Sequence, residues 1–286
     1  MHHTLRSSSY FLQQELEGLA AMLSLQFGQA SDAGKVRKNN EDAMGFFIPS
    51  SAKEAVSRGY LFAVADGVGG YDLGEVASST AVSVLVDEFT KAHAGARLIS
   101  LLPRLIQQAN VAIHDCTLEQ EHQDRMMATT VVACALRYDR AIVSHVGDSR
   151  CYLVRRGSAR QITDDHTWVN QQRKLGIISA SEMAESEARH VLIRSLGPEM
   201  FVAPDTTALD LYPGDVLVLS SDGLHDEMSE EVIASIASQK KDPGEIASEL
   251  VAKAVEIDGL DNATAQVIRI LSIERMSTMP RGRPYH

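Results

Sequence analysis

The stretch LFAVADGVGG, residues 61–70, ends an apolar run on an aspartate that is followed by three glycines. Leu61 to Ala65 has the composition of a strand buried on both faces, because five successive apolar residues leave no polar side. The stretch DVLVLSSDGL, residues 215–224, repeats the arrangement, since its apolar residues lead to Asp222 and Gly223. Two buried strands that each end on Asp-Gly ask for a common explanation.

A hairpin turn is the simple explanation for one Asp-Gly pair. Further acids, however, lie beside other predicted strands: Glu41 and Asp42 before 43–48, Asp148 after 141–146, and Asp261 before 263–271. Carboxylates that meet at one end of a sheet, away from water, repel one another unless a cation neutralises them. Oxygen ligands without a His or Cys cluster are those that Mg²⁺ or Mn²⁺ prefers. The Gly67 carbonyl can also approach an ion closely, because glycine has no side chain.

Arg37 lies in the same polar loop as Glu41 and Asp42. A guanidinium binds phosphate oxygens through two parallel hydrogen bonds, and a two-metal carboxylate site suits in-line displacement at phosphorus. The other interpretation of Arg37, an ordinary surface arginine, stays open on spacing alone. Together these residues predict a metal-dependent site that acts on a phosphate group.

The composition limits the class of protein. The chain has 286 residues, 44% of them hydrophobic and 23% charged, as in ordinary globular proteins. A net charge of −11 disfavours nucleic acid and anionic lipid as partners. No run approaches the roughly 20 apolar residues of a membrane span. The three cysteines have no paired spacing, which indicates free thiols and a cytoplasmic protein.

The pattern of predicted elements favours an α+β fold. Short strands occur in antiparallel-looking hairpins, and helices are grouped between them. We expect helices near 73–85 and 101–119, with Pro103 in the first turn of the second, and a helical, polar stretch over 166–200. Ser179 to Glu182 has the form of a capping box, and Asp242-Pro243 that of a helix start. We divide the chain into an extension (1–22), one domain (23–272) and a tail (273–286).

Nine segments occur in an order and spacing that resembles the protein phosphatase 2C family, the metal-dependent Ser/Thr protein phosphatases, in its bacterial form. The resemblance covers about residues 24–271. The segments are VRKNNEDA (36–43), VADGVGG (64–70), LGEVAS (73–78), MATT (127–130), HVGDSRCYLVR (145–155), ITDDHTWV (162–169), LIRSLG (192–197), LVLSSDGL (217–224) and LDNAT (260–264).

The resemblance implies a four-layer α-β-β-α sandwich, with two antiparallel sheets flanked by helices and a metal cleft at one end. It also implies a role for each matching residue. Asp66 would bridge two metal ions, Gly67 would offer its carbonyl, Asp222 and Asp261 would complete the ligands of the first ion, and Glu41 would hold the second, with Asp42 as a neighbouring acid. Asp148 and Asp222 would hold a third ion. Arg37 would bind the substrate phosphate, Asn262 belongs to the family's Asp-Asn pair with Asp261, and residues of about 170–195 would form a flap beside the cleft.

Two departures from the family pattern stand out. Val68 occupies the position where some members have a histidine proposed as general acid, so the leaving-group proton has no assigned donor. The family's Gly-Met-Gly-Thr-Thr is Met126-Met127-Ala128-Thr129-Thr130 here, and the loss of both glycines predicts a stiffer strand entry.

The leading hypothesis is hydrolysis of phosphoserine and phosphothreonine on proteins, with two or three Mn²⁺ or Mg²⁺ ions and with Asp66 and Arg37 as catalytic residues. Its implied partners are phosphorylated proteins and a Ser/Thr protein kinase that the enzyme opposes. One alternative is a catalytically weak module that binds phosphorylated partners through the same fold. Another is an esterase that acts on small phosphoesters.

Overall fold

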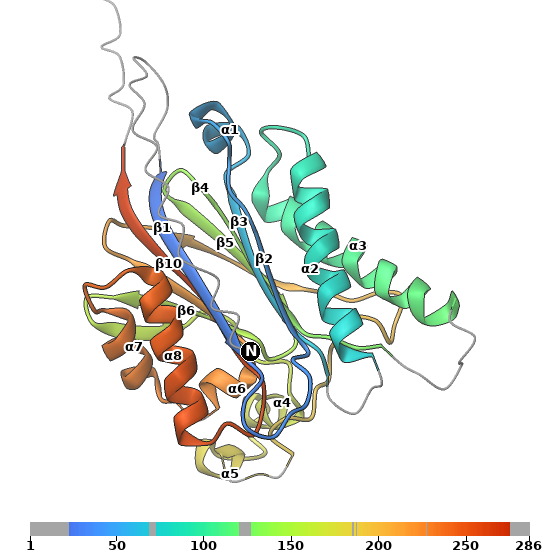
Figure 1. The fold of residues 1–286 in the computed structure, drawn as a ribbon. Coiled ribbons are helices and arrows are strands. Elements are labelled where there is room, and N and C mark those ends of the chain that lie inside the picture. Colours follow the sequence, from blue (N-terminus) through green and yellow to red (C-terminus); the bar gives the residue numbers. More distant parts are fainter. Residues whose placement is uncertain are drawn as a thin grey trace, which may run out of the picture.

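Two antiparallel five-stranded sheets form the centre of the fold in the part of the chain that the structure describes (Figure 1). The computed structural model describes residues 23–68, 73–119, 127–184, 186, 188–226 and 228–274. The predicted extension (1–22), most of the predicted tail, and Met126 lie outside these residues. No helix in the described ranges is long and apolar enough to cross a membrane.

The first sheet has the strand order β1-β10-β9-β6-β7. Its strands are β1 (Leu23–Asp32), β6 (Arg150–Arg155), β7 (Ser158–Gln161), β9 (Val216–Ser220) and β10 (Ala263–Ile273). The long β1–β10 pair runs from Leu23 opposite Ile273 to Asp32 opposite Ala263, so the loops that contain Arg37 and Asp261 emerge at the same end.

The second sheet has the strand order β2-β3-β4-β5-β8. Its strands are β2 (Asp42–Phe47), β3 (Tyr60–Asp66), β4 (Val131–Arg137), β5 (Arg140–Val146) and β8 (Asp205–Asp210). In the β2–β3 pair Asp42 lies directly opposite Asp66, which brings the first residue of one strand beside the last residue of the other.

The alternation of β3 explains its continuous apolar run. Leu61, Ala63 and Ala65 face the helices, whereas Phe62 and Val64 face the other sheet. All five side chains are fully buried. The strand is therefore covered on both faces, which is why LFAVA has no polar side.

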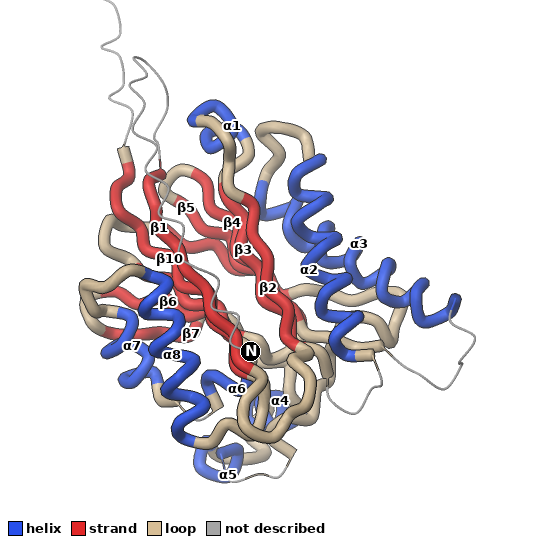
Figure 2. The backbone as a smooth tube through the Cα atoms, viewed as in Figure 1, coloured by secondary structure: helices blue, strands red, loops and turns tan. Residues whose placement is uncertain are grey.

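Helices cover the outer faces of both sheets (Figure 2). The helices are α1 (Ala52–Ser57), α2 (Gly74–Lys91), α3 (Leu98–Glu119), α4 (Trp168–Lys174), α5 (Ala180–Ala184), α6 (Asp222–His225), α7 (Glu230–Ala237) and α8 (Pro243–Ile257). The α2–α3 pair packs on the second sheet, and α7 with α8 packs on the first. The expected α-β-β-α sandwich is confirmed.

Several local expectations differ from the structure. The second long helix begins at Leu98, so Pro103 lies in its second turn and not in its first. Only α4 and α5 are helical within the described part of 166–200, because the remaining residues there form turns and loops. The expected helix starts are confirmed, since Ser179 accepts a hydrogen bond from Glu182 N at 3.3 Å and Asp242 accepts one from Gly244 N at 2.8 Å.

Candidate metal centre and active site

A polar cleft of about 490 Å³ opens at the end of the sandwich where the acid-bearing strand ends meet. Its walls come from the 33–41 loop, the end of β3, the β5–β6 turn, the start of α6 and the 258–261 loop, with 189–192 along one rim. The predicted residues that line it are Arg37, Glu41, Asp66, Gly67, Asp148, Asp222 and Asp261. Segments as far apart as residues 37 and 261 therefore meet in one site.

Asp66 is held by its backbone to the entry of β4. Its N–H donates to Thr130 Oγ1 at 3.1 Å, and its carbonyl accepts from Thr130 N and Thr129 Oγ1, each at 2.8 Å. Gly67 is fixed by close packing, because a Cβ there would lie 2.4 Å from the Gly74 carbonyl carbon. The turn after β3 thus needs glycine for its close packing against the start of α2.

Asp222 is the first residue of α6 and lies within hydrogen-bonding contact of Asp66. Burial, and then the charge of Asp222, raise the pKa of the Asp66 carboxyl well above its usual range. Burial, and then the charge of Asp261, raise the pKa of Asp222. The two carboxyls share a site that does not accept two negative charges without a cation.

Asp148 and Asp226 extend this cluster. Burial, followed by the charge of Asp222, raises the pKa of Asp148 well above its usual range and that of Asp226 to about 7. Sequence analysis missed Asp226. It lies four residues after Asp222, one helical turn away, so the spacing in SSDGLHD could have identified it.

Asp42 is not among the residues that line the cleft. Its Oδ2 accepts hydrogen bonds from Ser221 at 2.7 Å and Thr264 at 2.6 Å, while its buried Oδ1 has no partner within the described residues. Burial raises the pKa of Asp42 to about 7, against the lowering effect of these two hydroxyls. These contacts tie β2 to the ends of β9 and β10.

Asn262 fixes the loop that contains Glu41. Its Oδ1 accepts from Glu41 N at 2.7 Å, and its Nδ2 donates to the carbonyls of Ala33 and Asn39, each at 3.0 Å. Burial raises the pKa of the Glu41 carboxyl. Asn262 is itself buried, so it positions Glu41 through these hydrogen bonds without lining the cleft.

Arg37 forms an ion pair with a predicted metal ligand. Its Nη2 lies 2.7 Å from Asp261 Oδ2, and both side chains remain about two-fifths exposed, at 43% and 40%. The hydrogen bond that Arg37 donates to Asp261 raises the pKa of the guanidinium. Arg37 is thus at the edge of the cleft, in a contact that is open to solvent and to competition.

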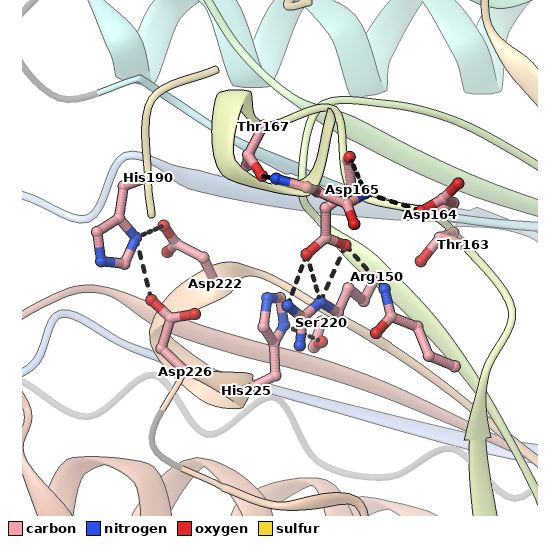
Figure 3. A network of polar contacts seen from close by, with 12 residues as sticks. Arg150, Thr163, Asp164, Asp165, Thr167, His190, Ser220, Asp222, His225 and Asp226 are labelled. Carbon is pink, nitrogen blue, oxygen red and sulfur yellow. Dashed lines mark hydrogen bonds and ion pairs between the residues drawn. The ribbon is translucent and has the colours of Figure 1, made fainter. Parts of the chain in front are cut away.

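His190 reaches Asp226 and Asp222 from the 188–192 segment at the rim (Figure 3). Its Nδ1 is 3.2 Å from Asp226 Oδ2 and 3.9 Å from Asp222 Oδ2. Its Nε2 accepts a hydrogen bond from Arg189 Nε at 2.7 Å, so in the neutral ring the hydrogen is on Nδ1 and points to Asp226. This pairing suits a hydrogen-bond donor better than a metal ligand, because a ligating imidazole donates through its other nitrogen. Sequence analysis did not single out His190 or Arg189.

A buried polar network lies beside the cleft acids Asp222 and Asp226 (Figure 3). Arg150 holds Asp165 by three contacts, the shortest at 2.6 Å, and Nη1 of Arg150 donates to Tyr152. Beside it, His166 Nδ1 accepts from Gly147 N at 3.1 Å, and its ring stacks on that of His145. Burial lowers the pKa of His166 to about 4 and also lowers that of His145, so both rings are neutral scaffold groups.

The chemistry of the donor set fits Mn²⁺ or Mg²⁺. Burial raises the pKa values of the Asp66, Asp148 and Asp222 carboxyls, the charge of Asp222 adds to this at Asp66 and Asp148, and the basic side chains that line the cleft include Arg37, Arg189 and His190. A divalent ion supplies the charge that this cluster lacks, and oxygen donors are the ligands that hard cations take. The unpartnered Oδ1 of Asp42 points to the same shortage of positive charge.

Comparison with known proteins agrees with this geometry. The family model described as protein phosphatase 2C matches residues 28–263. The chain belongs to the protein phosphatase 2C family. Its sequence is 33% identical over 256 residues to the serine/threonine phosphatase Stp of Listeria innocua, a match that covers 88% of this chain and 96% of that protein.

Solved structures of family members have the same fold. The Mycobacterium tuberculosis serine/threonine phosphatase PstP is 32% identical, with a TM-score of 0.76 over 88% of this chain and 100% of that one. A second structure of the PstP catalytic domain, in complex with two manganese ions, has a TM-score of 0.73, with the same identity and coverage. The fold expected from the nine segments is therefore that of solved family members.

Proposed function

We propose that this member of the family hydrolyses phosphoserine and phosphothreonine in proteins, using divalent ions held by the cleft carboxylates. One observation supports this most: Asp66, Asp222 and Asp261 converge from three separate strand ends on a cleft that also contains Arg37. The relatives named above are serine/threonine phosphatases, and one of them binds two manganese ions.

In this proposal Asp66, Asp222 and Asp261, with the Gly67 carbonyl and Glu41, would hold two ions of Mn²⁺ or Mg²⁺. Asp148 with Asp222 would hold a third, and Asp42 would support them from the position behind Asp66. When bound, the ions supply an activated water nucleophile and neutralise charge at phosphorus. Asn262 keeps the Glu41 loop in place through its three hydrogen bonds.

Arg37 is the group we assign to the substrate phosphate. Its guanidinium is exposed at the cleft and needs only to leave Asp261 to present parallel N–H donors to two phosphate oxygens. Val68, at the position of the histidine of some relatives, cannot donate a proton through its side chain. A guanidinium keeps its protons at neutral pH, so Arg37 contributes by binding and orienting the phosphate and not by proton transfer.

We assign the domain to residues 23–272 and the flap to about 170–195. The partners proposed are phosphorylated proteins and the Ser/Thr protein kinase that phosphorylates them, in the cytoplasm. The net charge of −11 disfavours nucleic acid as a partner.

The test is release of phosphate from a phosphothreonine peptide by the purified protein, with Mn²⁺, Mg²⁺ or a chelator, beside Asp222→Asn. We expect metal-dependent turnover that falls at least about a thousandfold in the variant, because Asp222 serves the shared cluster. Asp210→Asn, a change at an exposed aspartate of β8, is the matched control and keeps full turnover. No turnover by the folded protein with either metal would overturn the proposal and favour a module that only binds phosphorylated partners.

A further inference from the structure

A second groove adjoins the cleft, between the end of the flap and the loop that leads to β8. It has a volume of about 320 Å³, with residues 192–195 on one side and 198–203 on the other. Leu192 lines both the groove and the metal cleft. A peptide whose phosphate lies in the cleft can therefore continue across Leu192 into the groove.

The groove combines polar side chains, such as Glu199, with exposed apolar ones. Phe201 is 76% exposed, more than any other large hydrophobic side chain in the described residues, and Ile193 on the facing wall is 39% exposed. Val191 and Met200, which are next to lining residues in the sequence, are 52% and 54% exposed. Single exposed apolar residues are ordinary, but a contiguous set that faces a hollow marks a binding surface.

The outer wall of the groove is held rigidly on α3. Gln107 donates from Nε2 to Met200 O at 2.8 Å and accepts from Val202 N at 3.0 Å. Asn110, which is fully buried, donates to the carbonyl of Glu199 at 2.8 Å. Phe201 is thus exposed on a backbone that is fixed on both sides of it, and binding there costs little ordering entropy.

The inner wall is connected to the candidate catalytic residues. Leu196 donates to Thr129 O at 2.8 Å and accepts from Thr129 N at 3.2 Å, and Thr129 Oγ1 in turn donates to Asp66 O at 2.8 Å. Ile193 N donates to His166 O at 2.8 Å, which fixes the middle of this wall. The groove therefore keeps a constant position relative to Asp66.

We propose that this groove is a substrate subsite, which binds an apolar side chain that flanks the phosphorylated residue in an extended segment of the phosphoprotein. Continuity with the cleft through Leu192 supports this occupant, because a polypeptide whose phosphate lies in the cleft can leave it over this rim and enter the groove directly. Charge restricts it further: Glu199 lines the groove, and Arg194 is already paired with Asp205 at 3.0 Å, so an acidic flanking residue is disfavoured. The subsite rests on the proposed function, since it is defined relative to the bound phosphate.

The first experiment measures kcat/KM for phosphothreonine peptides in which one leucine replaces serine at each position near the phosphorylated residue. We expect an increase of about tenfold at a position on one side only, because a leucine side chain that is partly removed from water gains about 1.4 kcal/mol. Glutamate at that position should lower kcat/KM. A flat profile at every position would overturn the proposal.

The second experiment repeats the series with Phe201→Ser, which replaces an exposed side chain and should not affect folding. The variant should lose the leucine preference through a higher KM, while its hydrolysis of a small aryl phosphate is unchanged. Leu271→Ser, at an exposed position near the far end of β10, is the matched control and should keep the preference. A leucine preference that survives Phe201→Ser would contradict the subsite.

The two proposals fail in different ways. Loss of turnover on both peptide and aryl phosphate by the unmodified protein would count against the proposed function. Fluorescence anisotropy of labelled phosphopeptides with and without leucine, measured on the wild type and Phe201→Ser, still decides the groove in that case. Equal affinity for the two peptides would overturn the subsite.

Discussion

Two arginine–carboxylate pairs at this end of the sandwich have opposite characters. Arg150 contacts Asp165 three times in a buried setting, and Asp165 also accepts from Gln161 Nε2 at 2.8 Å. Arg37 meets Asp261 in one contact between half-exposed groups. A pair whose hydrogen-bonding groups are all satisfied stabilises one arrangement, whereas a single exposed contact exchanges readily for another ligand. The first pair belongs to the scaffold, and the second to the site.

The largest effect of a single substitution that we expect is on stability, from breaking the buried pair. Arg150→Met should lower the free energy of unfolding by about 3–5 kcal/mol, because Asp165 would remain buried without a counter-charge. Arg37→Met should lower it by less than about 1 kcal/mol, as is usual for exposed pairs. Urea denaturation of both variants in chelator measures the difference, and two equally small losses would contradict the contrast between the pairs.

The next effect concerns two acids with raised pKa values, Asp226 in the cleft and Asp42 behind it. Burial raises the pKa values of Asp42 and Asp226 to about 7, above the value of about 4 for the unfolded chain. Between these pH values the folded metal-free protein holds protons that the unfolded chain releases, so its stability falls as pH rises.

We therefore expect the free energy of unfolding in chelator to decrease from pH 4 to pH 7 by on the order of 3 kcal/mol for each of these two carboxyls, and the raised pKa values of Asp66, Asp148 and Asp222 act in the same direction. Saturating Mn²⁺ should remove most of this decrease, since the ion neutralises the ionised carboxylates. Urea unfolding at several pH values, with and without Mn²⁺, is the measurement. A metal-free stability that rises steadily over this range would be the contrary result.

A further effect is on turnover. Arg37→Met should reduce kcat/KM for a phosphothreonine peptide by about a hundredfold, because charge-assisted hydrogen bonds to the phosphate are lost. Arg140→Met, in an exposed pair with Asp210 on the opposite strand of the same sheet, is the control and should leave turnover unchanged. Equal activity of the two variants would show that Arg37 does not bind phosphate.

The smallest effect sharpens the contrast at Asp261. Arg37 and a metal ion would compete for the Asp261 carboxylate, so Arg37→Met should bind Mn²⁺ a few-fold more tightly than the wild type. Calorimetric titration of the metal-free proteins measures this shift. Weaker Mn²⁺ binding in the variant would instead mean that Arg37 supports the metal site.

Much of this architecture could be predicted from sequence because its signals are local. An apolar run that stops at an acid identifies both the strand and its end, as at Asp66 and Asp222. The order and spacing of nine short segments indicated the family. The alternation within β3 confirms the expectation of a strand buried on both faces. Cap signals at Ser179 and Asp242 depend on a few adjacent residues, and they too are confirmed.

What the sequence did not predict depends on contacts between distant residues. The ion pair of Arg37 joins residues 224 positions apart, and no local pattern predicts it. Asp226 was missed although it lies one helical turn after Asp222, because a single turn is a weak signal beside the stronger Asp222-Gly223 pair. His190 was missed because the polar segment around it has no regular pattern, and its position follows from packing at the rim. The groove at Phe201 likewise exists only once α3 fixes the loop beside it.

The central claim is that carboxylates from separate strand ends form one metal centre. Its most direct test is calorimetric titration of Mn²⁺ into metal-free wild type, Asp222→Asn and the surface control Asp210→Asn. The account predicts at least two ions bound to the wild type and to the control, and a clear loss of binding in Asp222→Asn. Equal Mn²⁺ binding by all three proteins, or no binding by the folded wild type, would contradict it.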